Sequence, residues 1–181
     1  MNACREVNAF EERSVETTFA IGHKIVYPGQ GPCRIGAVVE KVIGGQVGSY
    51  CRLVSLAENS ETVFVPLSKI NDLGIRQLMT KFEISAILRQ LGHPCQPRTN
   101  WKQREFVTLK RLSSGSAYDL ARVLESLTEL NEHRPLAPRE RQALDKARRL
   151  LICEISEVTG ESKNVTEEYL DNALKVHRGR S

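Results

Sequence analysis

The stretch Lys24-Ile25-Val26-Tyr27-Pro28-Gly29-Gln30-Gly31-Pro32 decides how the first half of the chain folds. Three of its first four residues are β-branched or aromatic, which favours a strand, and the run of Pro and Gly that follows ends this strand in a turn. Residues 34–43, 50–56 and 62–65 repeat the arrangement, each followed closely by turn-forming residues. Four or five short antiparallel strands predict a strongly bent sheet or barrel of the Tudor or SH3-like kind.

From Thr80 onward the apolar spacing changes to that of helices. Thr80-Lys81-Phe82-Glu83 has the pattern of a capping box at the start of a first helix. Further helices are predicted to begin near Asn100, after Ser116, near Pro138 and after Asn164. The side chains expected to face the core are Phe82, Ile84, Ile87, Leu88 and Leu91, then Phe106, Leu109 and Leu112, then Leu120, Val123, Leu124, Leu127 and Leu130, then Leu144, Ala147, Leu151, Ile155 and Val158, and finally Leu170, Ala173 and Leu174.

These patterns together predict an α+β chain, in which a Tudor-like β domain precedes an all-α bundle. The expected parts are a flexible tail over 1–17, the β domain over 18–76, a helix and linker over 77–97, and a helical domain over 98–181. No apolar run approaches the length of a membrane span and no secretion signal opens the chain, so a cytoplasmic protein without a membrane partner is expected.

Charge is concentrated in the second half of the chain. The formal net charge of +4 does not by itself indicate a nucleic-acid binder. Residues 98–149, however, contain 12 Lys and Arg against 7 Asp and Glu, so most of the positive charge lies in the predicted bundle. A basic helix face is usually only solvated, and the run over 139–149 is a weak indication when taken alone.

The stretch Arg98-Thr99-Asn100-Trp101-Lys102-Gln103-Arg104 carries the only Trp of the chain among three cations. Most Trp side chains serve as packing, and that interpretation stays open here. The alternative is an accessible indole that stacks on bases or inserts between base steps while the cations bind phosphates. Helical spacing puts Trp101 about 80° from Leu109, the expected centre of the buried stripe, and therefore at the edge of that stripe.

No pattern in the sequence predicts catalysis, a cofactor or a metal. The five cysteines are scattered without a C-x-x-C pair, and the four histidines have no metal-ligand spacing. Gly29-Gln30-Gly31 lacks the Lys and the following helix of a phosphate loop. A thiol- or metal-dependent enzyme is therefore the least favoured class.

Several segments resemble the CarD/CdnL family of bacterial transcription factors. The segment 19–31 is similar to its F-x-x-G-x-x-V-V-Y-P-x-x-G opening, and 62–66 with 74–76 are similar to T-V-x-V-P and V-G-x-R. The segments 100–104, 112–115 and 141–151 then match N-W-x-x-R, L-x-S-G and R-x-x-L-x-x-A-R-x-x-L in the same order. The resemblance spans roughly residues 19–174.

The resemblance implies a regulator that binds the β subunit of RNA polymerase and contacts promoter DNA at the upstream edge of the transcription bubble. The positions implied for polymerase binding are Lys41, Arg52, Phe64 and Pro66. The positions implied for DNA binding are Trp101, Lys102, Arg104, Arg139, Arg141, Lys146 and Arg148. Phe64 stands where the family often has Arg, and Gln103 replaces a frequent basic residue, so polymerase binding is expected to depend more on apolar contact here.

Two functions of different classes remain after the resemblance is considered. The first is a monomeric transcription factor with weak, non-sequence-specific affinity for DNA, because no base-reading motif is present. The second is a protein-interaction adapter whose bundle contacts another protein instead of DNA. Salt distinguishes the two, because the bundle's contribution to affinity should fall with rising salt concentration if it contacts DNA.

Overall fold

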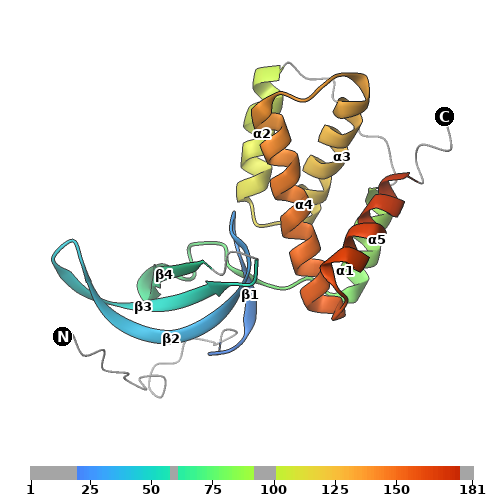
Figure 1. Cartoon of the computed structure of the whole chain (residues 1–181). Coiled ribbons are helices and arrows are strands. Elements are labelled where there is room, and N and C mark those ends of the chain that lie inside the picture. The colour runs from blue at the N-terminus through green and yellow to red at the C-terminus, as the bar shows by residue number, and fades with distance from the viewer. Residues whose placement is uncertain (1–19, 58–60, 92–100, 176–181) are drawn as a thin grey trace. The chain divides into compact units, whose positions relative to one another are not determined.

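The computed structural model describes residues 20–57, 61–91 and 101–175, with the backbone but not the side chains of Trp101 and Lys102. The chain divides into two compact units, Met1–Gln77 and Leu78–Ser181. Each unit has its own hydrophobic core. A curved antiparallel sheet forms the first unit and helices form the second, which confirms the predicted α+β class (Figure 1).

The sheet has five strands in the order β4-β3-β2-β1-β5. The strands are β1 (Lys24–Tyr27), β2 (Gly31–Ile43), β3 (Gln46–Ser55), β4 (Thr62–Pro66) and β5 (Arg76–Gln77), with the 3-10 helix η1 (Leu67–Lys69) after β4. The predicted β1 is confirmed, whereas β2 and β3 are longer than predicted and β5 was not predicted. The residues added to β2, 31–33, pair with β1. The residues added to β3, 46–49, pair with residues 40–43 of β2 across the Gly44-Gly45 turn, where both glycines have positive φ, of 62° and 80°.

The core of the first unit lies on one side of the sheet. Its buried members are Ile25, Cys33, Ile35, Cys51, Leu53 and Val65. Alternate residues of β3 and β4 therefore face away from this core, because successive side chains of a strand point to opposite faces. That alternation creates a second sheet face, on the side away from the core.

The second unit is a bundle of five helices. They are α1 (Lys81–Gln90), α2 (Trp101–Ser113), α3 (Ala117–His133), α4 (Pro138–Thr159) and α5 (Lys163–Lys175). Figure 1 shows α2, α3 and α4 side by side, and contacts join α1 to α3, α4 and α5. None of the described helices is both long and apolar enough to cross a membrane.

Two of the predicted helix caps agree with the structure and one does not. Thr80 and Glu83 form the predicted capping box, with Thr80 N–H donating to Glu83 at 2.7 Å and Glu83 N–H donating to the Thr80 hydroxyl at 3.2 Å. Ser116 caps α3 as predicted. The cap predicted at Asn164 is wrong, because Asn164 lies inside α5 and the Ser162 hydroxyl accepts the hydrogen bond from Val165 N–H at 3.3 Å.

The predicted inner faces hold for most helices and fail in two places. All five apolar positions predicted for α3 are buried. Phe82 at the start of α1, by contrast, is 76% exposed, and in α2 Phe106 and Leu109 are 70% and 58% exposed. Leu112 is the buried side chain among those described in α2, so the side of α2 that faces the bundle is mostly polar.

Candidate functional site

The four residues expected to contact polymerase lie on neighbouring strands of the first unit. Arg52 on β3 is paired with Phe64 on β4, and Tyr50 on β3 is paired with Pro66. The alternate residues Cys51, Leu53 and Val65 are buried on the other side of the sheet. Phe64, Pro66 and Arg52 consequently share the side that faces away from the core.

Lys41 is brought to the same surface from β2. Its Nζ atom lies 3.2 Å from the centroid of the Phe64 ring. A cation over an aromatic face at this distance is attracted by the ring quadrupole, contributing about 0.5–1 kcal/mol at an exposed site. Lys41, Arg52, Phe64 and Pro66 are hereafter called the cation-aromatic face.

The position of Arg52 depends on Gly36 in β2. A Cβ atom at residue 36 would lie 2.9 Å from Arg52 Nε and 3.0 Å from the Arg52 carbonyl oxygen. The pairing of β2 with β3 is also irregular here, between Ile35 and Val38. Glycine therefore gives the Arg52 side chain the space to lie across β2, a constraint that the sequence pattern did not reveal.

The residues expected to contact DNA are distributed over α2 and α4. Trp101 is the first residue of α2, and its side chain and that of Lys102 lie outside the described part of the structure. At about 100° per residue, position 101 falls in the same helical row as Thr108 and Leu112. Leu112 is buried and Leu109 is exposed, so the buried stripe of α2 is not centred on Leu109, as the spacing predicted. The Cα atom of Trp101 therefore lies on the bundle-facing side of α2.

Ion pairs join the beginning of α4 to α2 and to the end of α3. Arg139 Nη1 donates to Glu105 Oε1 at 2.9 Å. Arg134 holds Glu140 in a two-bond fork, with donor–acceptor distances of 2.9 and 2.7 Å. That fork lowers the pKa of Glu140. Burial acts in the opposite direction, whereas the hydrogen bond from the Ala137 N–H and the charges of Arg134 and Arg104 also lower the pKa. Arg134 was not predicted from the sequence as a site residue, although an Arg-Pro pair at a helix end, followed by Glu140, was a signal for this ion pair.

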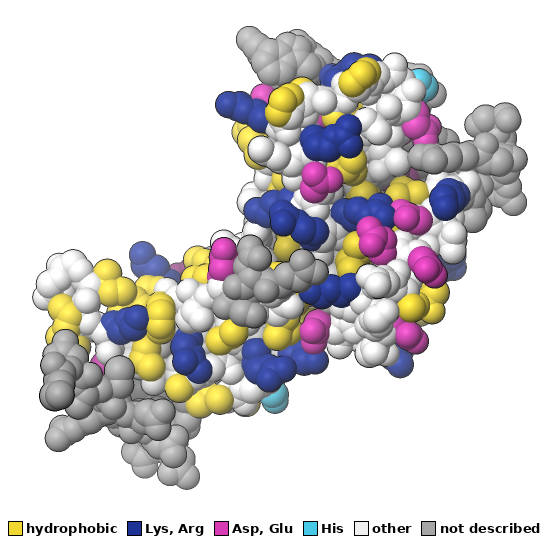
Figure 2. Space-filling view, viewed as in Figure 1, with side chains coloured by type: hydrophobic (Ala, Val, Ile, Leu, Met, Phe, Trp, Pro, Cys, Tyr) yellow, Lys and Arg dark blue, Asp and Glu magenta, His cyan; other side chains and the backbone are white. Residues whose placement is uncertain are grey.

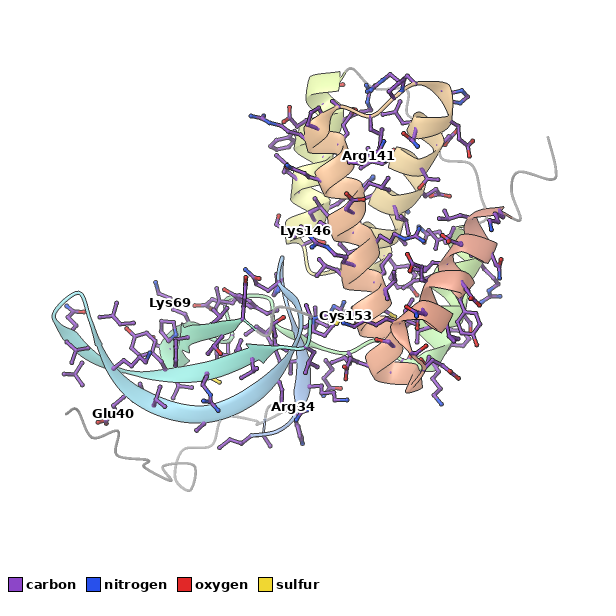
Figure 3. All side chains as sticks on the ribbon, in the orientation of Figure 1. Arg34, Glu40, Lys69, Arg141, Lys146 and Cys153 are labelled. Atoms are coloured by element: carbon purple, nitrogen blue, oxygen red, sulfur yellow. The ribbon has the colours of Figure 1, made fainter. Side chains whose placement is uncertain are left out.

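The cations of α4 do not form a single face, contrary to the sequence interpretation. At 100° per residue, Arg139 and Lys146 lie in one row and Arg141 and Arg148 in another, with more than 100° between the rows. Arg141 lies near the start of α4 and Lys146 nearer its middle (Figure 3). Figure 2 shows Lys and Arg side chains spread over the bundle and interspersed with acidic ones.

Arg148 is engaged inside the second unit. Its Nε donates to Glu167 at 3.0 Å and its Nη2 to Asp171 at 2.5 Å, which connects α4 to α5. Burial lowers the pKa of Arg148, but the hydrogen bonds and opposite charges of Asp171 and Glu167 together outweigh it, so the pKa is raised. Lys146, in contrast, forms no ion pair with any residue that the structure describes.

The thiols and acids offer no catalytic arrangement within the described ranges. Cys33, Cys51 and Cys153 are buried and form no disulfide with one another, and burial raises the pKa of Cys51. Cys4 and Cys95 lie outside the described residues. Across residues 20–57, 61–91 and 101–175, no group of three or more His, Cys, Asp or Glu side chains is placed to hold a metal ion.

The fold defines a two-domain protein, in which a sheet unit with a cation-aromatic face precedes a separate helical unit. Residues 19–79 match the family described as CarD-like/TRCF RID domain, and residues 83–171 match CarD, C-terminal domain. The chain is 29% identical over 153 residues to "Putative transcription factor YdeB" of Bacillus subtilis (strain 168), covering 84% of this chain and 97% of that protein. The chain belongs to the CarD/CdnL family, and its role is in transcription.

Proposed function

We propose that this protein binds the β subunit of RNA polymerase through its sheet unit and stabilises the open promoter complex through its helical unit, without catalysing a reaction. The observation that carries the proposal is the cation-aromatic face, on which the four expected contact residues meet away from the core. The match of residues 19–79 to the RID domain supports it, because RID denotes an RNA polymerase-interacting domain.

The position of β4 supports a specific mode of docking. β4 is an edge strand of the sheet, and it carries Phe64 and Pro66. An edge strand offers unpaired backbone N–H and C=O groups to which a strand of a partner can add. We infer that polymerase binds along β4, with backbone pairing supplying affinity and the cation-aromatic face supplying specificity.

Binding to purified β subunit tests this half of the proposal. Phe64→Ala removes both the ring and the support for Lys41, so the affinity should fall by about tenfold or more, as for a central interface residue. Glu40→Gln is the matched control, because Glu40 neighbours Lys41 but faces the other side of the strand. Equal affinities of wild type and Phe64→Ala would contradict the proposed face.

The helical unit is proposed to contact the distorted DNA at the upstream edge of the bubble. The proposed contacts are Trp101, Lys102 and Arg104 from α2 and Arg139 and Lys146 from α4. We leave Arg148 out because two carboxylates already hold it, and Arg141 lies in a different row from Lys146. Weak, salt-dependent binding is expected from so few phosphate contacts.

Trp101 is proposed to act as a wedge that binds the open state better than the closed one. Only such a difference in affinity shifts the equilibrium between the two states. Trp101→Ala should therefore shorten the lifetime of the open complex on a linear promoter, measured after addition of a competitor. Because the chain has a single Trp, quenching of its fluorescence by acrylamide measures directly whether the indole is accessible. A shielded indole and an unchanged lifetime would exclude the wedge.

A protein-interaction adapter remains a second candidate because of α2. Phe106 and Leu109 are exposed one turn apart, which suits contact with a protein better than contact with phosphates. Under this alternative, Phe106→Ser would weaken binding of the protein to promoter complexes. Lys146→Ala would not change how that binding depends on salt concentration. The reverse pattern is expected for DNA contact.

A further inference from the structure

Three further cations share the side of the sheet on which the cation-aromatic face lies. In an antiparallel sheet, directly opposite residues point to the same face and successive residues of a strand alternate. Arg34 follows the core residue Cys33, so it points away from the core, and Lys24 is directly opposite Arg34. Arg76 of β5 is opposite Val26, two residues after Lys24, and therefore also lies on this side. The basic sheet face is hereafter defined as Lys24, Arg34, Lys41, Arg52 and Arg76.

The two signs of charge are separated between the faces of the sheet. Glu40 is the only acid among the residues of the five strands, and its position next to Lys41 places it on the opposite side. Figure 2 shows several Lys and Arg side chains along the sheet unit, and Figure 3 shows Arg34 pointing away from the sheet near β1. A solvated protein surface usually intersperses both signs of charge, so this separation indicates an anionic partner.

The strand pairing also brings two like charges together. Lys24 and Arg34 are directly opposite each other on β1 and β2, and both are exposed. Like charges in directly opposite positions of neighbouring strands destabilise a sheet. Within the described ranges, no ion pair engages Arg34. The stability of the sheet therefore gives no reason for this pair of cations, whereas binding of an acidic group does.

The β subunit of RNA polymerase is the partner that the continuity of this surface favours. Arg52 is opposite Phe64 on β4, and Val54, two residues further along β3, is opposite Arg34 on β2. Lys24 and Arg34 thus lie on the same sheet surface as the residues proposed to bind the β subunit, further across the sheet. A nucleic acid is less favoured, because the edge strand β4 of the same surface offers backbone groups that suit a strand of a protein.

We propose that Lys24 and Arg34 bind an acidic segment of the β subunit, beyond the part of that subunit that contacts β4. The inference rests on the proposed function and extends its docking surface across the sheet. Both cations are exposed, so salt screens their attraction to carboxylates and their contribution to affinity falls as salt rises. Loss of the Phe64 ring, in contrast, removes apolar contact that salt does not screen.

The test replaces both cations by glutamine in the full-length chain and measures affinity for purified β subunit at low and high salt. Glutamine removes the charge, and the sheet loses a like-charge repulsion, so the variant stays folded. The double variant Lys24→Gln, Arg34→Gln should bind about threefold to tenfold more weakly at low salt and like wild type at high salt. Arg34→Lys should keep the wild-type affinity, and Arg34→Glu should bind more weakly than Arg34→Gln.

Lys69→Gln is the matched control for Arg34→Gln. Lys69 is an exposed cation of the same unit, but it lies in η1, whose neighbouring residues Leu67 and Ile70 pack against the core. Its replacement should leave the affinity for the β subunit unchanged. An equal loss of affinity in Lys69→Gln and Arg34→Gln would show that only net charge matters, and would overturn the proposal.

The remaining outcomes separate this contact from the proposed function. If the double variant binds like wild type at low salt while Phe64→Ala weakens binding, the acidic contact is wrong and the proposed function stands. If wild type does not bind the β subunit at either salt concentration, both fail. If the double variant keeps its affinity for the β subunit but loses affinity for duplex promoter DNA, these cations bind phosphates and the proposal is overturned.

Discussion

Glu125 on α3 is an acid in an environment that opposes its charge. It is 8% exposed, and one of its carboxylate oxygens has no hydrogen-bond partner among the described residues. Burial, and secondly the charge of Glu129 one turn later, raise its pKa to about 7, while Arg122 acts in the opposite direction. The neutral form is therefore favoured in the folded protein below about pH 7.

Glu125→Gln should remove a pH-dependent loss of stability. Between about pH 4.5 and pH 7 the unfolded chain releases this proton while the folded chain keeps it, so stability falls as pH rises through the folded pKa of about 7. The Gln variant should be more stable than wild type by on the order of 2 kcal/mol at pH 8 and equal to it near pH 4. Urea unfolding at several pH values measures the difference, with the exposed Glu168→Gln as control. If the Gln variant and wild type differed in stability by the same amount at every pH, this explanation would be wrong.

At the scale of helices, Arg148 and Lys146 separate structural from binding roles on α4. Arg148 joins α4 to α5 through Glu167 and Asp171, whereas Lys146 has no ion-pair partner in the described ranges. The two residues are two positions apart in the same helix. They consequently form a matched pair for mutation.

Arg148→Ala should loosen α5, and Lys146→Ala should not. Losing two partly exposed ion pairs costs about 1 kcal/mol, which should raise amide hydrogen exchange in α5 about fivefold. The salt dependence of promoter complexes should change with Lys146→Ala and stay the same with Arg148→Ala. The assignment of a structural role to Arg148 and a binding role to Lys146 would be wrong if exchange were faster in both variants. It would also be wrong if the salt dependence changed in Arg148→Ala alone.

The helices also show where the sequence was sufficient. The five inward residues of α3 follow the helical period without interruption, and the capping signals of α1 and α3 are local, so both were predicted correctly. In α2, Phe106 and Leu109 have the same apolar spacing but remain exposed. Spacing identifies an apolar stripe, and it does not say whether the protein's own core or a partner covers that stripe.

The candidate site was predictable only in part, because its geometry depends on contacts between strands. The resemblance named Lys41 and Phe64, but only the pairing of β2, β3 and β4 brings the ammonium group over the ring. The grouping of the α4 cations into one face ignored the helical angle between them. The partners of Arg148 lie 19 and 23 residues away on α5, beyond the reach of local patterns.

At the scale of the whole molecule, the two cores are separate sets of residues. The sheet core extends from Ile25 to Val65, and the helical core begins at Met79. Met79 N–H donates to the buried Glu154 carboxylate at 2.9 Å, so the few residues before α1 belong to the helical unit. Each unit therefore has the internal contacts of an independent domain.

A fragment of residues 78–181 should fold alone. Its circular dichroism should be helical and its urea unfolding cooperative, because its buried side chains all lie within the fragment. A fragment beginning at residue 80 loses the bond from Met79 to Glu154 and should be less stable by about 1–3 kcal/mol. Unfolded fragments in both cases would show that the bundle needs the sheet unit.

The close approach of Arg52 to Gly36 predicts a relation between these two positions among related chains. A Cβ atom at residue 36 would meet both the side chain and the carbonyl oxygen of residue 52, whereas the φ of residue 36 does not itself demand glycine. A short residue at the position of Arg52 removes the first of these contacts, so relatives that have one should carry Ala or Ser at the position of Gly36 more often than relatives that retain the arginine. An alignment in which the two positions vary independently would show that the arginine reaches elsewhere in those proteins.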